Sequence, residues 1–114
     1  MINDWTQLLS NQRAAGANLS KANEPVVKAF FGLNESLHEA NALDLKTREL
    51  IALAVAVTTL CEGCIAAHAA AAQKAGASKQ EVAEALGTAI ALNAGAAFVY
   101  SARALEAFDQ FGNK

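Results

Sequence analysis

The chain has 114 residues and a net charge of −2, with 54% hydrophobic and 18% charged residues. This length favours a single domain over residues 1–114, and the hydrophobic content excludes a disordered chain. The small net charge and the lack of a Lys/Arg cluster argue against a nucleic-acid partner. Alanine fills 28 positions and proline one. Because Ala is the best helix former and Pro the worst, the chain is expected to be all-α.

The sequence also indicates the cellular compartment of the protein. Residues 1–7 lack the basic start and apolar stretch of a signal peptide. The longest apolar run, residues 50–61, falls short of the ~20 residues that a membrane span needs. A longer Ala-rich stretch, residues 82–108, is interrupted by charged side chains. We therefore expect a cytoplasmic protein without membrane contact. In that compartment two cysteines are more often catalytic, redox-active or metal-binding than a structural disulfide.

Helix start signals mark the first three of six expected helices. The first runs from about residue 4 to residue 20. Asn23 as cap and Pro25 in the first turn begin the second. Asp44 caps the third, which ends near Thr59 and is apolar on every side, as is typical of a buried central helix. Five Ala-rich neighbours barely surround such a helix, so we expect a second subunit to cover part of the apolar surface.

The remaining helices are predicted from caps and glycines. The fourth begins at the Cys61–Cys64 segment and ends before Gly76, which supplies a left-handed C-terminal residue. Ser78 and Glu81 form a capping box that begins the fifth helix, which runs to about Asn93. Gly95 is expected to separate it from a sixth helix that carries five aromatic or large aliphatic side chains between residues 98 and 108, and Phe111. The predicted fold is thus a six-helix bundle.

Cys61, Cys64 and His68 form the candidate site. At about 100° per residue, Cys61 and His68 lie about 20° apart around the helix axis and Cys64 about 40° from His68, so all three share one face. Cysteines three apart on a helix have Cα atoms roughly 5–6 Å apart, a separation that a disulfide can bridge. The helix N-terminus favours thiolate, and His68 can accept the thiol proton.

Glu49 joins this site if the third and fourth helices are antiparallel. It lies about 15 Å down the third helix from Thr59, and His68 lies about 10 Å down the returning helix from Cys61. The two side chains would then be nearly level, and Glu49 could orient the imidazole directly or through a water. Two other interpretations stay open at this point: inert core cysteines, and a zinc site that lacks its second Cys/His pair.

The spacing from Glu49 through Cys61-Glu62-Gly63-Cys64 to His68 resembles the signature of the alkylhydroperoxidase D-like, or carboxymuconolactone decarboxylase, family. The helical layout from about Pro25 to Phe108 resembles its single-domain members. This resemblance implies an all-helical homotrimer or homohexamer. It also implies reduction of a small-molecule hydroperoxide by the cysteine pair, with a Glu–His proton relay and an external dithiol reductant of protein or lipoyl type. Neither an organic cofactor nor a metal is then needed.

In redox members of the family the second cysteine attacks the peroxide and the first resolves it, which assigns attack to Cys64 and resolution to Cys61. The residues alone leave this order open, because Cys61 lies nearer the helix terminus and Cys64 nearer His68. Gly63 stands where the best-known redox member has histidine, which implies either weaker peroxide turnover or a different substrate. Two alternative functions stay open: a decarboxylase-like acid–base enzyme, and a non-catalytic oligomer that senses metal or redox state. The family's decarboxylase branch lacks the cysteine pair, which argues against the first.

Overall fold

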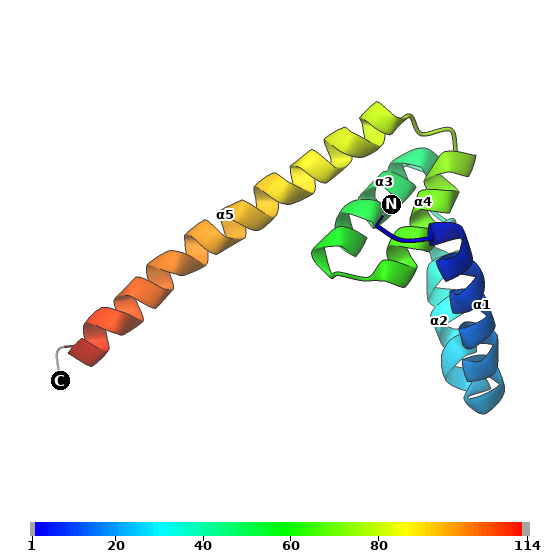
Figure 1. Cartoon of the computed structure of the whole chain (residues 1–114), viewed down its shortest axis with the longest axis horizontal. Coiled ribbons are helices and arrows are strands. Elements are labelled where there is room, and N and C mark those ends of the chain that lie inside the picture. Colours follow the sequence, from blue (N-terminus) through cyan, green and yellow to red (C-terminus); the bar gives the residue numbers. More distant parts are fainter. Residues whose placement is uncertain (1, 113–114) are drawn as a thin grey trace.

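The computed structural model describes residues 2–112, which form helices joined by short loops and contain no strand (Figure 1). The all-α prediction is confirmed. The helices in chain order are α1 (Trp5–Ala22), α2 (Glu24–Ser36), α3 (Leu45–Thr58), α4 (Glu62–Lys74) and α5 (Lys79–Gly112).

Most of the predicted helix caps form as expected. The Asp44 carboxylate accepts the Thr47 N–H in the first turn of α3 at 2.8 Å, as predicted. Asp4, for which no cap was predicted, accepts the Gln7 N–H in the first turn of α1 at 3.1 Å. Ser78 and Glu81 bond reciprocally, with the Ser78 hydroxyl accepting from the Glu81 N–H at 3.0 Å. Asn23 occupies the N-cap of α2 but its side chain makes no capping hydrogen bond. The predicted N-cap position of α2 is therefore confirmed, whereas the prediction that the Asn23 side chain would form a capping hydrogen bond was wrong.

The prediction of six helices was wrong, because α5 runs unbroken from Lys79 to Gly112. Gly95 lies inside this helix, and no atom outside the helix lies within 4 Å of the position a Cβ would occupy. Glycine in a helix costs roughly 1 kcal/mol relative to alanine, which does not by itself end a helix. The flanking alanines favour continuation, and no neighbouring element within residues 2–112 forces the chain to turn there.

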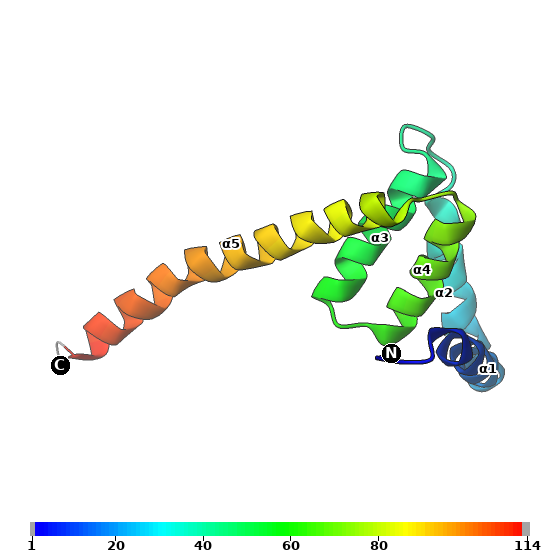
Figure 2. The ribbon, with the colours of Figure 1, turned by 45° about the horizontal axis from the view of Figure 1, so that its top comes forward.

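Helix α3 lies at the centre and packs against α4 and α5, while α1 packs against α2 and α4 (Figures 1 and 2). Two contacts fix how α5 runs along α3. Lys46 pairs with Glu81 at the start of both helices, at 2.9 Å, and the Asn93 amide donates to the Thr58 hydroxyl at the end of α3, at 3.0 Å. The two helices are therefore parallel, and beyond Asn93 α5 extends past the end of α3, away from the other four helices (Figure 2).

This single copy has a thin core. Its buried apolar side chains are small or few: Val27, Leu53, Ala56, Ala66, Ala72 and Ala89. The radius of gyration is 18.8 Å, against about 13 Å for a compact chain of this length. The accessible surface is 8961 Å², against about 5,900 Å² for a folded monomer of this mass. One copy thus leaves on the order of 3,000 Å² more surface exposed than a globular monomer does.

The expectation of a fully buried third helix holds for only part of its circumference. Leu53 and Ala56 are buried, but Ile51 and Val55 are 49% and 56% exposed. The buried side faces α4 and α5, whereas the other side is left partly open to solvent. One side of α3 is therefore left accessible by this chain although its residues are apolar.

Helix α5 is also long and apolar enough, by length and composition alone, to cross a membrane. No charged residue lies between Glu84 and Arg103. A single helix of this kind is weak evidence for a span, because helices packed inside proteins meet the same criteria. The first part of α5, which packs on α3, is unlike a free membrane anchor.

Candidate functional site

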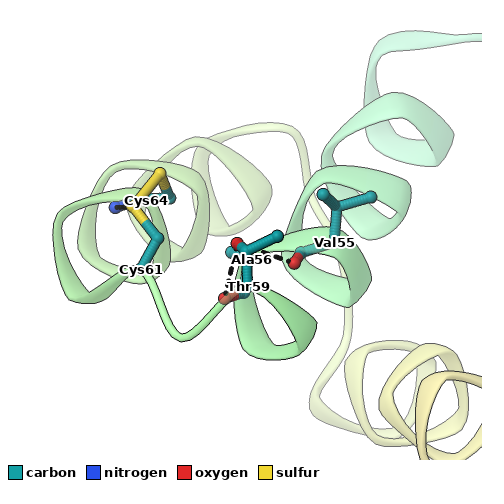
Figure 3. The surroundings of a disulfide bond; sticks show 5 residues. All are labelled: Val55, Ala56, Thr59, Cys61 and Cys64. Carbon is teal, nitrogen blue, oxygen red and sulfur yellow. Dashed lines mark hydrogen bonds between the residues drawn. A yellow bond between two sulfur atoms is a disulfide. The ribbon is translucent and has the colours of Figure 1, made fainter. Parts of the chain in front are cut away.

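The connection between α3 and α4 brings the cysteine segment back against α3. Leu60 adopts a left-handed backbone conformation with φ of 56° and is 84% exposed. The next residue, Cys61, then donates its N–H to the Ala56 carbonyl at 3.0 Å. The hydroxyl of Thr59, the C-cap residue of α3, donates to the Val55 carbonyl at 3.1 Å (Figure 3). The Thr59 side chain thus satisfies a carbonyl group in the last turn of α3. This reversal places Cys61 at the N-cap of α4.

Cys61 and Cys64 are joined by a disulfide bond across the first turn of α4 (Figure 3). Their Cα atoms are 5.2 Å apart, within the range expected from the sequence. The Cys61 Sγ also accepts the backbone N–H of Cys64 at 3.2 Å, so sulfur takes the place of a capping oxygen. The positive end of the helix dipole therefore lies at Cys61, where it stabilises a thiolate once the bond is reduced.

Glu49 and His68 form the second part of the site. The Glu49 Oε2 atom lies 2.7 Å from the His68 Nδ1 atom, between α3 and α4. The Glu49 side chain is 13% exposed and the His68 side chain 35%. Because Nδ1 is engaged by the carboxylate, Nε2 is the ring nitrogen left to exchange a proton. The antiparallel register expected from the sequence is confirmed by this direct contact.

A pocket of about 590 Å³ opens on the side of α3 that the chain leaves exposed. Apolar side chains dominate its lining, among them Leu37, Leu43, Ile51 and Val55. Cys64 and His68 line it as well, whereas Cys61 and Glu49 do not. Pockets of this volume and apolar character hold small organic ligands. The four residues singled out in the sequence therefore meet at one place, with Cys64 and His68 facing the pocket and the other two behind them.

Two residues that sequence reasoning did not select also belong to this region. Arg48 lines the pocket. Its signal was present in the sequence, since residues 48, 51, 52 and 55 recur at helical spacing on one face of α3. Gln12 of α1 lies against Gly63, with side-chain atoms 3.2 Å from where a Cβ would stand. No local pattern predicts that contact, because α1 and Gly63 meet only through tertiary packing.

Gly63 stands between the two cysteines and adjoins Gln12 of α1. A Cβ at Gly63 would require the exposed Gln12 side chain to shift by a few tenths of an ångström. A zinc site was one of the two alternative interpretations of the cysteines and His68 that the sequence left open. Within residues 2–112, no group of three or more His, Cys, Asp and Glu side chains is arranged to hold a metal ion. Both sulfur atoms are bonded to each other in this state.

Comparison with known proteins identifies the family. The sequence profile of the carboxymuconolactone decarboxylase family matches residues 24–107, which is most of the chain. The chain belongs to the carboxymuconolactone decarboxylase family. The matched segment begins at the first residue of α2 and includes Glu49, both cysteines and His68. The family resemblance drawn from the motif is thereby confirmed.

Relatives of this carboxymuconolactone decarboxylase family protein cover nearly its whole length. An uncharacterized protein of Haemophilus influenzae is 56% identical over 108 residues, which is 95% of this chain and 96% of that protein. Uncharacterized protein 4 in the cox locus of Paracoccus denitrificans is 36% identical over 97 residues, covering 85% and 87% of the two chains. These similarities extend beyond the motif to the helices that carry it.

Two solved structures share the fold. The crystal structure of an apo carboxymuconolactone decarboxylase family protein from Legionella pneumophila superposes with a TM-score of 0.74 and 34% identity, covering 94% of this chain and 96% of that one. A protein from Methanobacterium thermoautotrophicum gives a TM-score of 0.69 and 27% identity, covering 75% and 96%. The all-α arrangement is therefore the fold of this family.

Proposed function

We propose that this protein is a thiol-dependent peroxidase or disulfide reductase. One observation carries the proposal: the Cys61–Cys64 disulfide borders an apolar pocket that Cys64 shares with His68, and Glu49 holds that histidine. A bonded pair on one helical turn can be opened and closed without moving the backbone far. A base with a fixed ring orientation supplies the proton transfer that thiol chemistry needs.

The cycle starts from the reduced pair. The Cys64 thiolate attacks the terminal peroxide oxygen, the O–O bond breaks, and the alkoxide leaves as an alcohol after it takes a proton from His68. Cys64 is then a sulfenic acid. His68 receives a proton from the Cys64 thiol before attack, through Nε2, and Glu49 stabilises the imidazolium formed. The Glu49 carboxylate and the His68 ring are already 2.7 Å apart, so this transfer needs no large rearrangement.

The second half of the cycle restores the dithiol. The Cys61 sulfur attacks the Cys64 sulfenic acid, an S–S bond forms and water leaves. An external dithiol of protein or lipoyl type then reduces this disulfide by thiol–disulfide exchange and becomes a disulfide itself. Two electrons thus pass from the dithiol to the peroxide in each cycle. The disulfide form is the state that awaits the reductant.

Pocket geometry supports attack by Cys64 rather than Cys61. Cys64 lines the pocket and Cys61 does not, so a peroxide bound there meets Cys64 first. Cys61 at the N-cap receives the larger share of the helix dipole, which suits a sulfur that must react quickly as resolving thiolate or leave easily in exchange.

The thin core and large exposed surface of one copy support assembly into a homo-oligomer, a trimer or hexamer. On the far part of α5, the side chains of Phe98 and Phe108 are 81% and 74% exposed. In α2, those of Phe30 and Phe31 are 59% and 60% exposed. Aromatic side chains can each bury roughly 150–250 Å², so these faces together supply an interface of ordinary size for each copy. We place the assembled protein in the cytoplasm, where dithiol reductants are available.

Turnover of hydroperoxides with a set of dithiol reductants tests the proposed function. Wild-type protein should reduce peroxide in a reductant-dependent way, and Cys64→Ser should abolish turnover. Reduced Cys61→Ser, freed of dithiol, should still consume about one equivalent of peroxide and then stop, because its Cys64 sulfenic acid has no resolving partner. Equal, slow peroxide consumption by wild type and Cys64→Ser would rule the proposal out.

A thiol count provides a test that does not depend on the choice of substrate. Reduced protein should lose both titratable thiols on treatment with one equivalent of peroxide, without forming a covalent dimer on a non-reducing gel. Two free thiols that persist after peroxide treatment would show that the pair is not redox-active.

A further inference from the structure

Among residues 2–112, Arg48 is the one cationic side chain of fixed charge that lines the pocket. It lies one turn from the start of α3, and with Ile51 and Val55 it occupies the helix face that lines the pocket. Its neighbour Glu49 faces the other way, toward His68 on α4. The pocket therefore combines apolar walls with a guanidinium group, which lies at one end of the row of α3 residues that lines it.

The charged residues around Arg48 are already paired with other groups. Asp44 accepts the Thr47 N–H, and hydrogen bonding by the Thr47 side chain, then by this N–H, lowers the pKa of the Asp44 carboxyl below the usual range. Lys46 pairs with Glu81 at 2.9 Å, and Glu49 contacts His68. No hydrogen bond or ion pair involves the Arg48 side chain within the described chain. Within one copy, Arg48 thus brings an uncompensated positive charge to an apolar pocket.

A guanidinium in such a place favours a particular kind of ligand. Arginine binds carboxylates through two parallel hydrogen bonds, and it carries its charge at every physiological pH. Apolar walls beside it bury the hydrocarbon part of a ligand, and the positive end of the α3 dipole adds to the attraction for an anion. The matching ligand has an apolar body and one carboxylate.

The spacing of Arg48 and Cys64 sets where the reacting group would lie. Arg48 adjoins Glu49, which is level with His68, and Cys64 precedes His68 by four residues. Four residues correspond to about 6 Å along a helix axis. A carboxylate held by Arg48 would therefore leave room for several bonds of hydrocarbon before the sulfur of Cys64.

We propose that Arg48 binds the carboxylate of amphipathic acids in this pocket, and that the peroxide substrates are hydroperoxides of such acids. The second half of this statement rests on the proposed peroxidase function, and the first half does not. Arg48 is here a specificity-determining residue: it holds one end of the substrate and takes no part in the transfer of electrons or protons.

Binding of octanoate, compared with 1-octanol, tests the carboxylate site without turnover. The protein is used in its disulfide form, and binding is followed by chemical-shift perturbation or calorimetry. Wild type should bind octanoate more tightly than 1-octanol. Arg48→Gln should weaken octanoate binding by about tenfold or more, the usual effect of losing a charged hydrogen bond, and leave 1-octanol binding unchanged. Arg48→Lys should fall between the two.

Arg13→Gln serves as the matched control. Arg13 is exposed on α1 and does not line the pocket, so this substitution removes the same charge at a distant site. Unchanged 1-octanol binding by Arg48→Gln establishes that the pocket is still folded. Octanoate binding that is equally tight in wild type and Arg48→Gln, or that is absent in wild type, would overturn the proposal.

Turnover separates this proposal from the peroxidase proposal. A hydroperoxide of a medium-chain acid and its methyl ester should give similar kcat values, with a lower KM for the acid. Arg48→Gln should raise the KM for the acid alone. If wild type reduces neither compound but binds octanoate through Arg48, the peroxidase function fails and the carboxylate site stands. If KM for acid and ester are equal and unaffected by Arg48→Gln, the substrate class is wrong while peroxidase function stands.

Discussion

The Glu49 carboxylate lies 2.7 Å from the His68 imidazole, although 19 residues separate the two in sequence. The contact joins α3 to α4 at the level of the pocket, and it fixes which imidazole nitrogen remains for chemistry. Most of the Glu49 side chain is covered, at 13% exposure, so its charge is better shielded from solvent than that of a surface carboxylate. This pair gives the site a defined base beside Cys64.

Glu49→Gln is expected to slow peroxide reduction by about 10²–10⁴, the usual effect of removing one member of an acid–base chain. Glutamine keeps the size and helix propensity but loses the charge that stabilises the imidazolium. His68→Gln should slow the reaction at least as much. The double variant should be little slower than His68→Gln alone, because members of one catalytic unit do not act additively.

The direct measurement for this relay is the pH profile of alkylation of Cys64, made in a Cys61→Ser background so that one sulfur reacts. Cys64 should titrate with a pKa below the ~8.5 of free cysteine, and both substitutions should shift the profile back toward that value. Thermal unfolding should change little. An alkylation profile that neither substitution moves would remove Glu49 and His68 from the mechanism.

Gly95→Ala and Gly76→Ala should affect stability in opposite directions. Gly95 lies within α5 with open space around it, so alanine should stabilise the folded chain by about 0.5–1 kcal/mol. Gly76 has a φ of 86° at the end of α4, where alanine should cost about 1–2 kcal/mol. Urea unfolding of both variants and wild type measures the difference. A destabilising Gly95→Ala would indicate that another copy packs closely at this position.

The far part of α5 should mediate association. Wild-type protein is expected to show a mass of several times 11.8 kDa by light scattering at micromolar concentration. Phe98→Glu and Phe108→Glu should each weaken association by at least tenfold, because each replaces roughly 1.5–3 kcal/mol of aromatic burial with a charge. Ala14→Glu, an exposed change on α1, is the control. A monomeric wild-type mass would contradict the interpretation of α5 as an interface.

The Lys46–Glu81 pair should make stability depend weakly on pH. The hydrogen bond from Lys46 lowers the pKa of Glu81, and the same bond raises the pKa of Lys46. The contribution of Glu81 is therefore present above its unfolded pKa and is lost as the pH falls through its folded value. That of Lys46 is present below its unfolded pKa and is lost as the pH rises through its folded value.

Glu81→Gln tests this pair, because glutamine can still bond the Ser78 N–H in the capping box but carries no charge. At neutral pH the variant should unfold at a slightly lower temperature than wild type. The difference should shrink below pH 4 and in 1 M salt, since both side chains are more than a third exposed and are screened. A difference of the same size at acidic and neutral pH would assign it to packing rather than charge.

Local chemistry alone specified much of this protein. Caps and glycines act within a few residues, so Asp44, Gly76 and the Ser78–Glu81 box could be assigned from the sequence. The spacing of Cys64 and His68 on a helix placed both on the pocket face in the same way, whereas Cys61 is the N-cap of α4 and does not line the pocket. The length of α5 could not be assigned, because whether Gly95 ends a helix depends on what packs against it.

The contacts between helices needed the tertiary structure. Helical rise alone predicted that Glu49 and His68 are level, but only the packing of α3 on α4 brings their side chains to bonding distance. Gln12 reaches Gly63, and Arg48 joins the pocket, through the placement of helices that sequence periodicity does not orient. Periodicity determines which residues share a face, whereas the neighbour of that face is set by how the helices bury their apolar surface together.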